Sequence, residues 1–125
     1  LGVRSGRLAP CPCSANCVSS DADDNDHHVP AFELVRSAID GWGAVRAAVA
    51  NLPRTTIVTD TPDYLPCECR SAAFGFVDDL ELHLRPMQKL IAVRSASRLG
   101  RSDLGVNRQR VESLRALLRA QGVIG

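Results

Sequence analysis

The sequence predicts an α+β domain in which two helices pack on one face of an antiparallel sheet of about four strands. Three observations predict it: an apolar stripe at helical spacing before residue 53, alternating strand patterns through residues 55–97, and a second helical stripe at the end. A length of 125 residues favours one domain, and 45% apolar residues is a globular composition.

Residues 1–30 show neither helical nor strand periodicity, and we interpret them as an irregular arm laid over a single domain of residues 31–125. The arm holds the acidic run Asp21–Asp26, followed by His27 and His28. Closely spaced carboxylates can bind calcium, but the glycine and the closing glutamate of an EF-hand loop are missing. We therefore favour a solvated loop over a cation site.

The five cysteines indicate an oxidising compartment and at least one disulfide. Three of them cluster in the arm, at Cys11, Cys13 and Cys17, and their spacing is not one that zinc sites use. Cys67 and Cys69 lie two apart on a predicted strand, about 6.5–7 Å from each other, which is too far for a mutual bridge. Either one pairs with the arm or both are small buried side chains.

The first helix is predicted over Ala31–Leu52. Its apolar stripe is Val35, Ala38, Ile39, Trp42, Val45, Val49 and Leu52. Gly41 and Gly43 would let another element approach closely, and Pro53 ends the helix.

The strands follow in sequence, with turns at Thr61–Asp63 and Pro86. We predict them at Thr55–Thr59, Tyr64–Arg70, Phe74–Leu84 and Lys89–Ser97. Matching the apolar faces of the last two strands fixes their register. The predicted pairs are Leu84 with Ile91, Leu82 with Val93, Leu80 with Ser95, Asp78 with Ser97 and Glu81 with Arg94.

The last helix is predicted to begin at Asp103 or Asn107 and to end near Gln121, with Val111, Leu114 and Leu118 facing inward. Positive charge is unfavourable at a helix start, so Arg108 and Arg110 should have an anionic partner.

Asp78 is the second unusual charge, because the register places it on the buried face of the sheet. A buried carboxylate is costly unless it is paired, and the candidate donors are Ser95, Ser97, an arginine or the amides that begin the last helix. We favour a structural ion-pair network that locks this helix to the hairpin over a pocket for phosphate or carboxylate. The network's candidate residues are Asp78, Asp79, Glu81, Arg94, Ser95, Ser97, Arg98, Asp103, Asn107, Arg108, Arg110 and Glu112.

Catalysis finds little support in the sequence. No pattern links the histidines to a serine, and no phosphate-loop glycine pattern is present. Asp79 and Glu81 share a sheet face and could act as an acid–base pair, but we interpret them as surface charges. We predict no catalytic residue, metal site or cofactor. A net charge of +1 argues against nucleic acid as a partner, and no apolar run is long enough for a membrane span.

Several motifs carry a family resemblance. They are Leu8–Pro12, Asn16–Ser20, Tyr64–Leu65, Phe76–Glu81, Arg94–Arg98, Gly100, Ser102–Arg108, Arg110 and Glu112. With them the chain resembles DUF1499, an uncharacterised domain found in bacteria and in algal and plant plastids. The resemblance implies a small domain, often exported or organelle-targeted, without an established reaction. It also implies a Cys11–Cys17 disulfide, and Cys13 stands where the family more often has serine.

We expect a non-catalytic accessory subunit that makes protein–protein contacts in an oxidising compartment. The plastid branch of the resemblance, and a start without Met that suggests removal of a targeting peptide, favour the thylakoid lumen. The bacterial periplasm is the other compartment considered. The expected partner is a larger, membrane-associated complex such as a photosystem. The alternative is an anion-binding domain or small enzyme centred on Arg94–Arg110.

Overall fold

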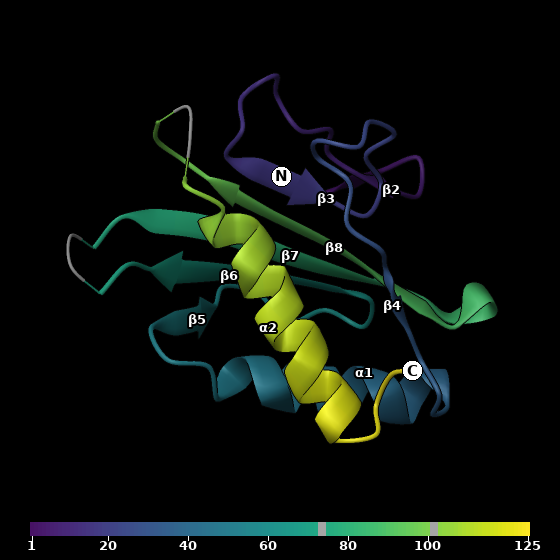
Figure 1. The fold of residues 1–125 in the computed structure, drawn as a ribbon. Helices are drawn as coiled ribbons and strands as arrows, with labels where there is room; N and C mark the ends of the chain where they lie inside the picture. Colours follow the sequence, from purple (N-terminus) through teal and green to yellow (C-terminus); the bar gives the residue numbers. More distant parts are fainter. Residues whose placement is uncertain (73–74, 101–102) are drawn as a thin grey trace.

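The computed structural model describes residues 1–72, 75–100 and 103–125, and in them two α-helices lie on one face of a six-stranded antiparallel sheet (Figure 1). The elements in chain order are β1 (Val3–Arg4), β2 (Arg7–Leu8), β3 (Cys17–Ser19), β4 (Phe32–Glu33), α1 (Ala38–Ala50), β5 (Thr55–Ile57), β6 (Tyr64–Arg70), β7 (Val77–Arg85), the 3-10 helix η1 (Pro86–Gln88), β8 (Leu90–Ser97) and α2 (Val106–Ala120). The predicted α+β class is confirmed, with a larger sheet than expected.

The sheet runs in the order β3-β8-β7-β6-β5, and β4 also pairs with β8. The two strands beyond the predicted four come from segments where no strand was predicted. β3 lies in the arm, and β4 lies in the part of the chain assigned to the first helix. The arm is therefore more ordered than its lack of periodicity suggested, and β1 and β2 form a separate small hairpin within it.

The predicted register of the central hairpin is confirmed at every predicted pair. Leu84 lies opposite Ile91, and Leu82 lies opposite Val93. The same register places the carboxylate of Asp78 opposite Ser97, and Asp78 is buried on the core face of the sheet. This hairpin positions the candidate site.

The predicted start of the first helix is wrong. Residues 32–34 are extended, and Phe32 and Leu34 are buried with period two while Val35 is exposed. The helix begins where the Ser37 hydroxyl accepts a hydrogen bond from the Asp40 amide at 3.2 Å, which is an N-cap. Ile39 is 85% exposed, so it is also not part of the inner stripe.

The close approach predicted at the helix glycines does occur at Gly41. A Cβ atom there would lie only 2.6 Å from Leu34 Cδ2, so glycine lets the extended segment pack against α1.

Two predicted strands have different limits in the structure. The first ends at Ile57, and β7 begins at Val77. Phe76 is therefore not a core strand residue but an exposed one, and the predicted strand residue Phe74 lies outside the described residues. The inner stripe of α2 is confirmed, since Val111, Leu114 and Leu118 are almost fully buried.

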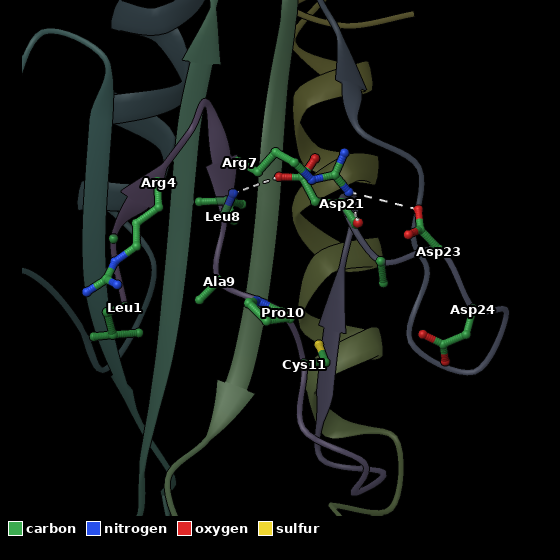
Figure 2. A pocket seen from close by; sticks show the side chains of 12 residues that line it. Leu1, Arg4, Arg7, Leu8, Ala9, Pro10, Cys11, Asp21, Asp23 and Asp24 are labelled. Atoms are coloured by element: carbon green, nitrogen blue, oxygen red, sulfur yellow. Dashed lines mark hydrogen bonds and ion pairs between the residues drawn. The ribbon is translucent and has the colours of Figure 1, made fainter.

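The arm covers the sheet face opposite the helices. Figure 2 shows the β1–β2 hairpin in front of the sheet, with a helix behind it. The Gly2 amide donates to Glu81 Oε1 at 2.9 Å, and Arg94 Nη2 donates to the Pro10 carbonyl at 3.3 Å. The interpretation of Asp79 and Glu81 as surface charges is therefore wrong, because the covering arm leaves both buried. Of the helices in the described residues, none has the length and apolar character to span a bilayer.

Candidate functional site

The centre of the candidate site is an ion pair between Asp78 on β7 and Arg110 on α2. Arg110 Nη2 donates to Asp78 Oδ2 at 2.8 Å, and Nη1 donates to Ser95 Oγ at 3.1 Å. Both charged side chains are mostly shielded from solvent. The structure thus gives Asp78 the arginine partner that its buried position required, and the pair docks α2 onto the hairpin.

Asn107 joins the same network and is fully buried. Its Oδ1 accepts from the Ser95 hydroxyl at 2.7 Å and from Arg110 Nη1 at 2.8 Å. Its Nδ2 lies within hydrogen-bond distance of Ser97 Oγ, at 2.8 Å, and of the Asn16 carbonyl, at 3.1 Å. One side chain therefore connects α2, β8 and the arm, which explains an asparagine at this fully buried position.

Asp103 completes the start of α2. Its Oδ2 accepts from the Asn107 amide at 3.0 Å, and its Oδ1 accepts from the Gly105 amide at 2.8 Å. Burial alone would raise the pKa of Asp103, but the hydrogen bonds from Asn107 and Gly105 outweigh it, so the pKa is lowered. Neither predicted residue is the N-cap, which is Gly105, but the Asp103 carboxylate still satisfies two amides at the start of the helix.

A second polar group lies on the face under the arm. Glu81 is fully buried, and its Oε2 accepts from Arg94 Nη1 at 3.1 Å. Its Oε1 accepts from the Tyr64 hydroxyl at 2.5 Å. Burial, and then the hydrogen bond to Glu81, raise the pKa of Tyr64. The sequence did not predict that Tyr64 belongs to this polar group. Its position on β6, opposite His83, nevertheless places it on the same sheet face beside the group.

The remaining predicted residues also have protein partners. Arg98 contacts Asp79 at 2.8 Å and Glu68 at 2.9 Å, which raises the pKa of its guanidinium. Arg108 donates to the backbone carbonyls of Asp26 and His28, so it binds the arm and not an acidic side chain. Glu112 accepts from Arg115 at 3.0 Å.

The acidic loop of the arm has a structural role. Asp21 forms a two-contact ion pair with Arg85, at 2.8 and 2.6 Å, and accepts from the Leu8 amide at 2.9 Å. Burial raises the pKa of Asp21, but the hydrogen bonds from Arg85 and Leu8 lower it further than burial raises it. His27 contacts Asp24 at 2.5 Å. Within the described ranges, no group of three potential ligands could hold a metal ion.

The cysteines separate into one disulfide and three thiols. Cys11 and Cys17 are bridged, with Cα atoms 5.7 Å apart, as the family resemblance implied. Cys13 is free and exposed, whereas Cys67 and Cys69 are free and buried in the core. Burial raises the pKa of Cys67 to about 12 and also raises that of Cys69, so both remain protonated thiols at neutral pH.

Two large hollows lie near the candidate residues, and smaller ones adjoin Glu81 and Arg110. One, with a volume of about 720 Å³, lies between the β1–β2 hairpin and the Asp21–Asp24 loop, where Arg7 contacts Asp23 at 3.9 Å (Figure 2). The other, of about 650 Å³, lies over the start of α2 and is lined by Phe76, Leu99 and Val106 together with Asp78 and Arg98, whose charges are already paired. Neither offers an unpaired arginine of the predicted network to an anion.

Chemically, this arrangement is a closed network. Each predicted charged residue has a protein partner within hydrogen-bond distance. His27 Nε2 contacts Ser14 at 2.7 Å through the backbone carbonyl and not through a hydroxyl that it could activate as a nucleophile.

Comparison with known proteins adds one match. A family model described as "Protein of unknown function (DUF1499)" matches residues 7–118. The match covers nearly the whole domain, including the network and the disulfide. No curated protein and no solved structure shows a significant match.

Proposed function

The chain belongs to the DUF1499 family, and from this premise we propose that it is a non-catalytic accessory subunit of a larger complex in an oxidising compartment. The observation that carries the proposal is the closed ion-pair network. A catalytic or anion-binding motif needs charged groups that face a substrate, whereas Asp78, Glu81 and Arg110 are satisfied by the protein itself. The polar motif then serves to hold a scaffold in one conformation.

The proposed assignment to an oxidising compartment is supported by the disulfide in the arm. The Cys11–Cys17 bridge is compatible with an oxidising space, where such bonds form and persist. In its narrower form the proposal is a peripheral subunit on the lumenal side of a photosynthetic membrane complex in a plastid. That form is supported by the plastid members of the family, and the bacterial periplasm is the alternative compartment.

An apolar end of the molecule supports a partner contact. Phe76, Leu99 and Val106 are 55%, 73% and 44% exposed and line one hollow. They lie where β7 begins, β8 ends and α2 begins. Exposed apolar side chains gathered around a hollow are typical of protein–protein contacts.

The proposal is tested by isolating the native complex. We expect a tagged chain to co-migrate with a membrane complex on native gels of gently solubilised source membranes, in fixed stoichiometry. The double variant Phe76→Ser/Leu99→Ser should lose this association. Met87→Ser is the matched control, because Met87 is 97% exposed on the opposite hairpin turn and should not alter it.

Three outcomes would count against the proposal. They are a chain that migrates alone, an association insensitive to the apolar variants, and turnover of a small molecule by the purified chain. The alternative, an anion site or enzyme centred on Arg94–Arg110, receives no specific support from the geometry of those arginines.

A further inference from the structure

The two edges of the large sheet differ. At one edge, Ser19 of β3 forms a bridge with His28, and the Ser19 amide donates to the His27 carbonyl at 2.7 Å, so the arm closes that side. At the other edge, β5 is the last strand in the order and pairs with β6 alone among the described strands (Figure 1). The β5 edge is therefore the one at which a further strand could be added.

Backbone pairing determines which groups of β5 face outward. The Val58 amide donates to the Pro66 carbonyl at 2.9 Å, and the Arg54 carbonyl accepts from a β6 amide at 2.9 Å. In an antiparallel ladder, residues bonded to the neighbouring strand alternate with residues whose N–H and C=O point away from it. Thr55 and Ile57 therefore direct these groups away from β6, and no hydrogen bond in the described part of the chain uses them.

The sequence of this edge lacks the features that usually protect one. Natural sheets block open edges with lysine, proline or a bulge, because unpaired backbone groups attract another strand. Residues 55–59 read Thr-Thr-Ile-Val-Thr, so all five are β-branched and uncharged. Thr56, Val58 and Thr59 are exposed. This combination favours the addition of an extended strand from another chain.

We propose that the added strand is β5 of a second copy of this chain, paired antiparallel about a two-fold axis at Ile57. This register places Thr55 opposite Thr59 of the second copy, so the outward backbone groups on the two strands meet. On the same face, the two Ile57 side chains come together, and such β-branched pairs stabilise a sheet. The proposal goes beyond the accessory function and rests on residues other than the apolar end, so the two can fail separately.

Charge complementarity selects the second copy and this register. Arg54 precedes the strand and Asp60 follows it, each three residues from Ile57. Pairing about Ile57 therefore sets Arg54 of each copy opposite Asp60 of the other, and a shift by two residues would lose both ion pairs. Arg54 is exposed and has no carboxylate partner in the described ranges. Asp60 uses one oxygen for Arg46, at 2.9 Å, which leaves the other oxygen for a partner.

The test is sedimentation velocity of the purified chain at low ionic strength, from about 10 µM to about 1 mM. Every sample carries Cys13→Ser, since Cys13 is exposed and could join copies through a disulfide. We expect a reversible monomer–dimer equilibrium, and a weak one, because a single edge strand buries less area than a standard interface.

Arg54→Glu and Asp60→Lys should each weaken the dimer by about tenfold, because each places two pairs of like charges across the interface. An equimolar mixture of these two variants should regain the parental affinity, since both pairs in the mixed dimer are again of opposite charge. Arg4→Glu makes the same charge change on an exposed residue of β1 and should leave the dissociation constant unchanged.

Amide hydrogen exchange gives a readout that needs no charge variant. Protection of the outward Ile57 amide should rise with protein concentration, whereas that of the Thr56 amide, which faces β6, should not. A mixture no tighter than the single variants, or an Ile57 amide insensitive to concentration, would overturn the proposal. A chain that remains monomeric at about 1 mM would also overturn it and leave the edge for an extended segment of another protein.

Discussion

Glu81 is the most completely buried charged residue in the described part of the chain. It shows what the alternation of side chains along a strand can and cannot predict. The register of β7 and β8 predicts its pairing with Arg94, because matching apolar faces leaves no other arrangement. Its burial was not predictable, because the arm that covers it carries no periodic pattern. Arg94 Nε has no hydrogen-bond partner, so Glu81 provides the principal compensation for that buried cation.

Removing one partner of this pair should be far more harmful than removing both. Glu81→Ala leaves the Arg94 charge buried and unpaired, so we expect a loss of about 3–5 kcal/mol in the free energy of unfolding. The double variant Glu81→Leu/Arg94→Leu should lose much less, because neither member of the pair is left as a buried, unpaired charge. Urea denaturation measures both.

The exposed Glu33→Ala is the control and should change stability by less than about 0.5 kcal/mol. A double variant as unstable as the sum of the two single variants would show that Glu81 and Arg94 are not coupled.

For Asp78, in contrast to Glu81, the burial was predictable and the pairing partner was not. Its position on the apolar face already implied a paired, buried carboxylate, and the structure confirms this. The identity of the partner, Arg110, was one of several possibilities. Choosing among them requires the position of α2 across the sheet, which depends on packing between elements distant in sequence.

At the scale of elements, α2 was predictable and the start of α1 was not. The stripe of α2 is strongly periodic, although its N-cap, Gly105, is neither of the two residues predicted for that position. Before α1, Phe32 and Leu34 fit both a helical and an alternating pattern over a short window. Pairing of Phe32 with Ile91 on β8 selects the extended form, and that long-range contact is invisible in the local sequence.

Asp103 caps two amides at the start of α2, although Gly105 is the N-cap, and these hydrogen bonds should contribute measurably to the stability of the helix. Asp103→Ala removes the acceptor for the Gly105 and Asn107 amides, so we expect a loss of about 1 kcal/mol in the free energy of unfolding. Asp103→Asn keeps an acceptor oxygen and should lose less. Thermal and urea unfolding followed by circular dichroism measure both, with the fully exposed Asp23→Ala as control. Equal stability of Asp103→Ala and the parent would show that the cap is not used.

For the whole molecule, the arm is the part that sequence reasoning described least well. Its strands are only two or three residues long, too short for any periodicity to be recognised. Their placement comes from contacts with distant residues: Cys17 pairs with Ala96, and Asp21 binds Arg85. The arm thus completes the sheet and covers its second face, and its ion pairs tie overall stability to pH.

Near neutral pH the stability depends on two histidines, His83 and His27, whose pKa values are shifted in opposite directions. Burial, and then the nearby charge of Arg85, lower the pKa of His83 in the folded chain. The unfolded chain therefore binds more protons at this residue, and the free energy of unfolding falls as the pH decreases through the unfolded pKa of 6.5. Hydrogen bonding to the Ser14 carbonyl, and then to Asp24, raises the pKa of His27. Its contribution is present below the unfolded value and is lost as the pH rises through the folded one. The two histidines therefore place a maximum of stability near pH 6.5, because His83 lowers stability on the acid side of that value and His27 lowers it on the alkaline side.

At acid pH the contributions of Asp21 and Asp103 to stability add, because both carboxyl groups have lowered pKa values. Each contributes stability that is fully present above its unfolded pKa of 3.8 and is lost as the pH falls through the lower folded pKa. We therefore expect the free energy of unfolding to decrease from about pH 5 to about pH 2. Asp21→Asn should make this decrease shallower, since the amide cannot take up the proton that breaks the ion pair with Arg85. Urea denaturation across this range measures the slope, and Asp23→Asn, at an exposed position, should retain that of the parent. An unchanged slope in Asp21→Asn would mean that the arm is not held to the sheet by this ion pair.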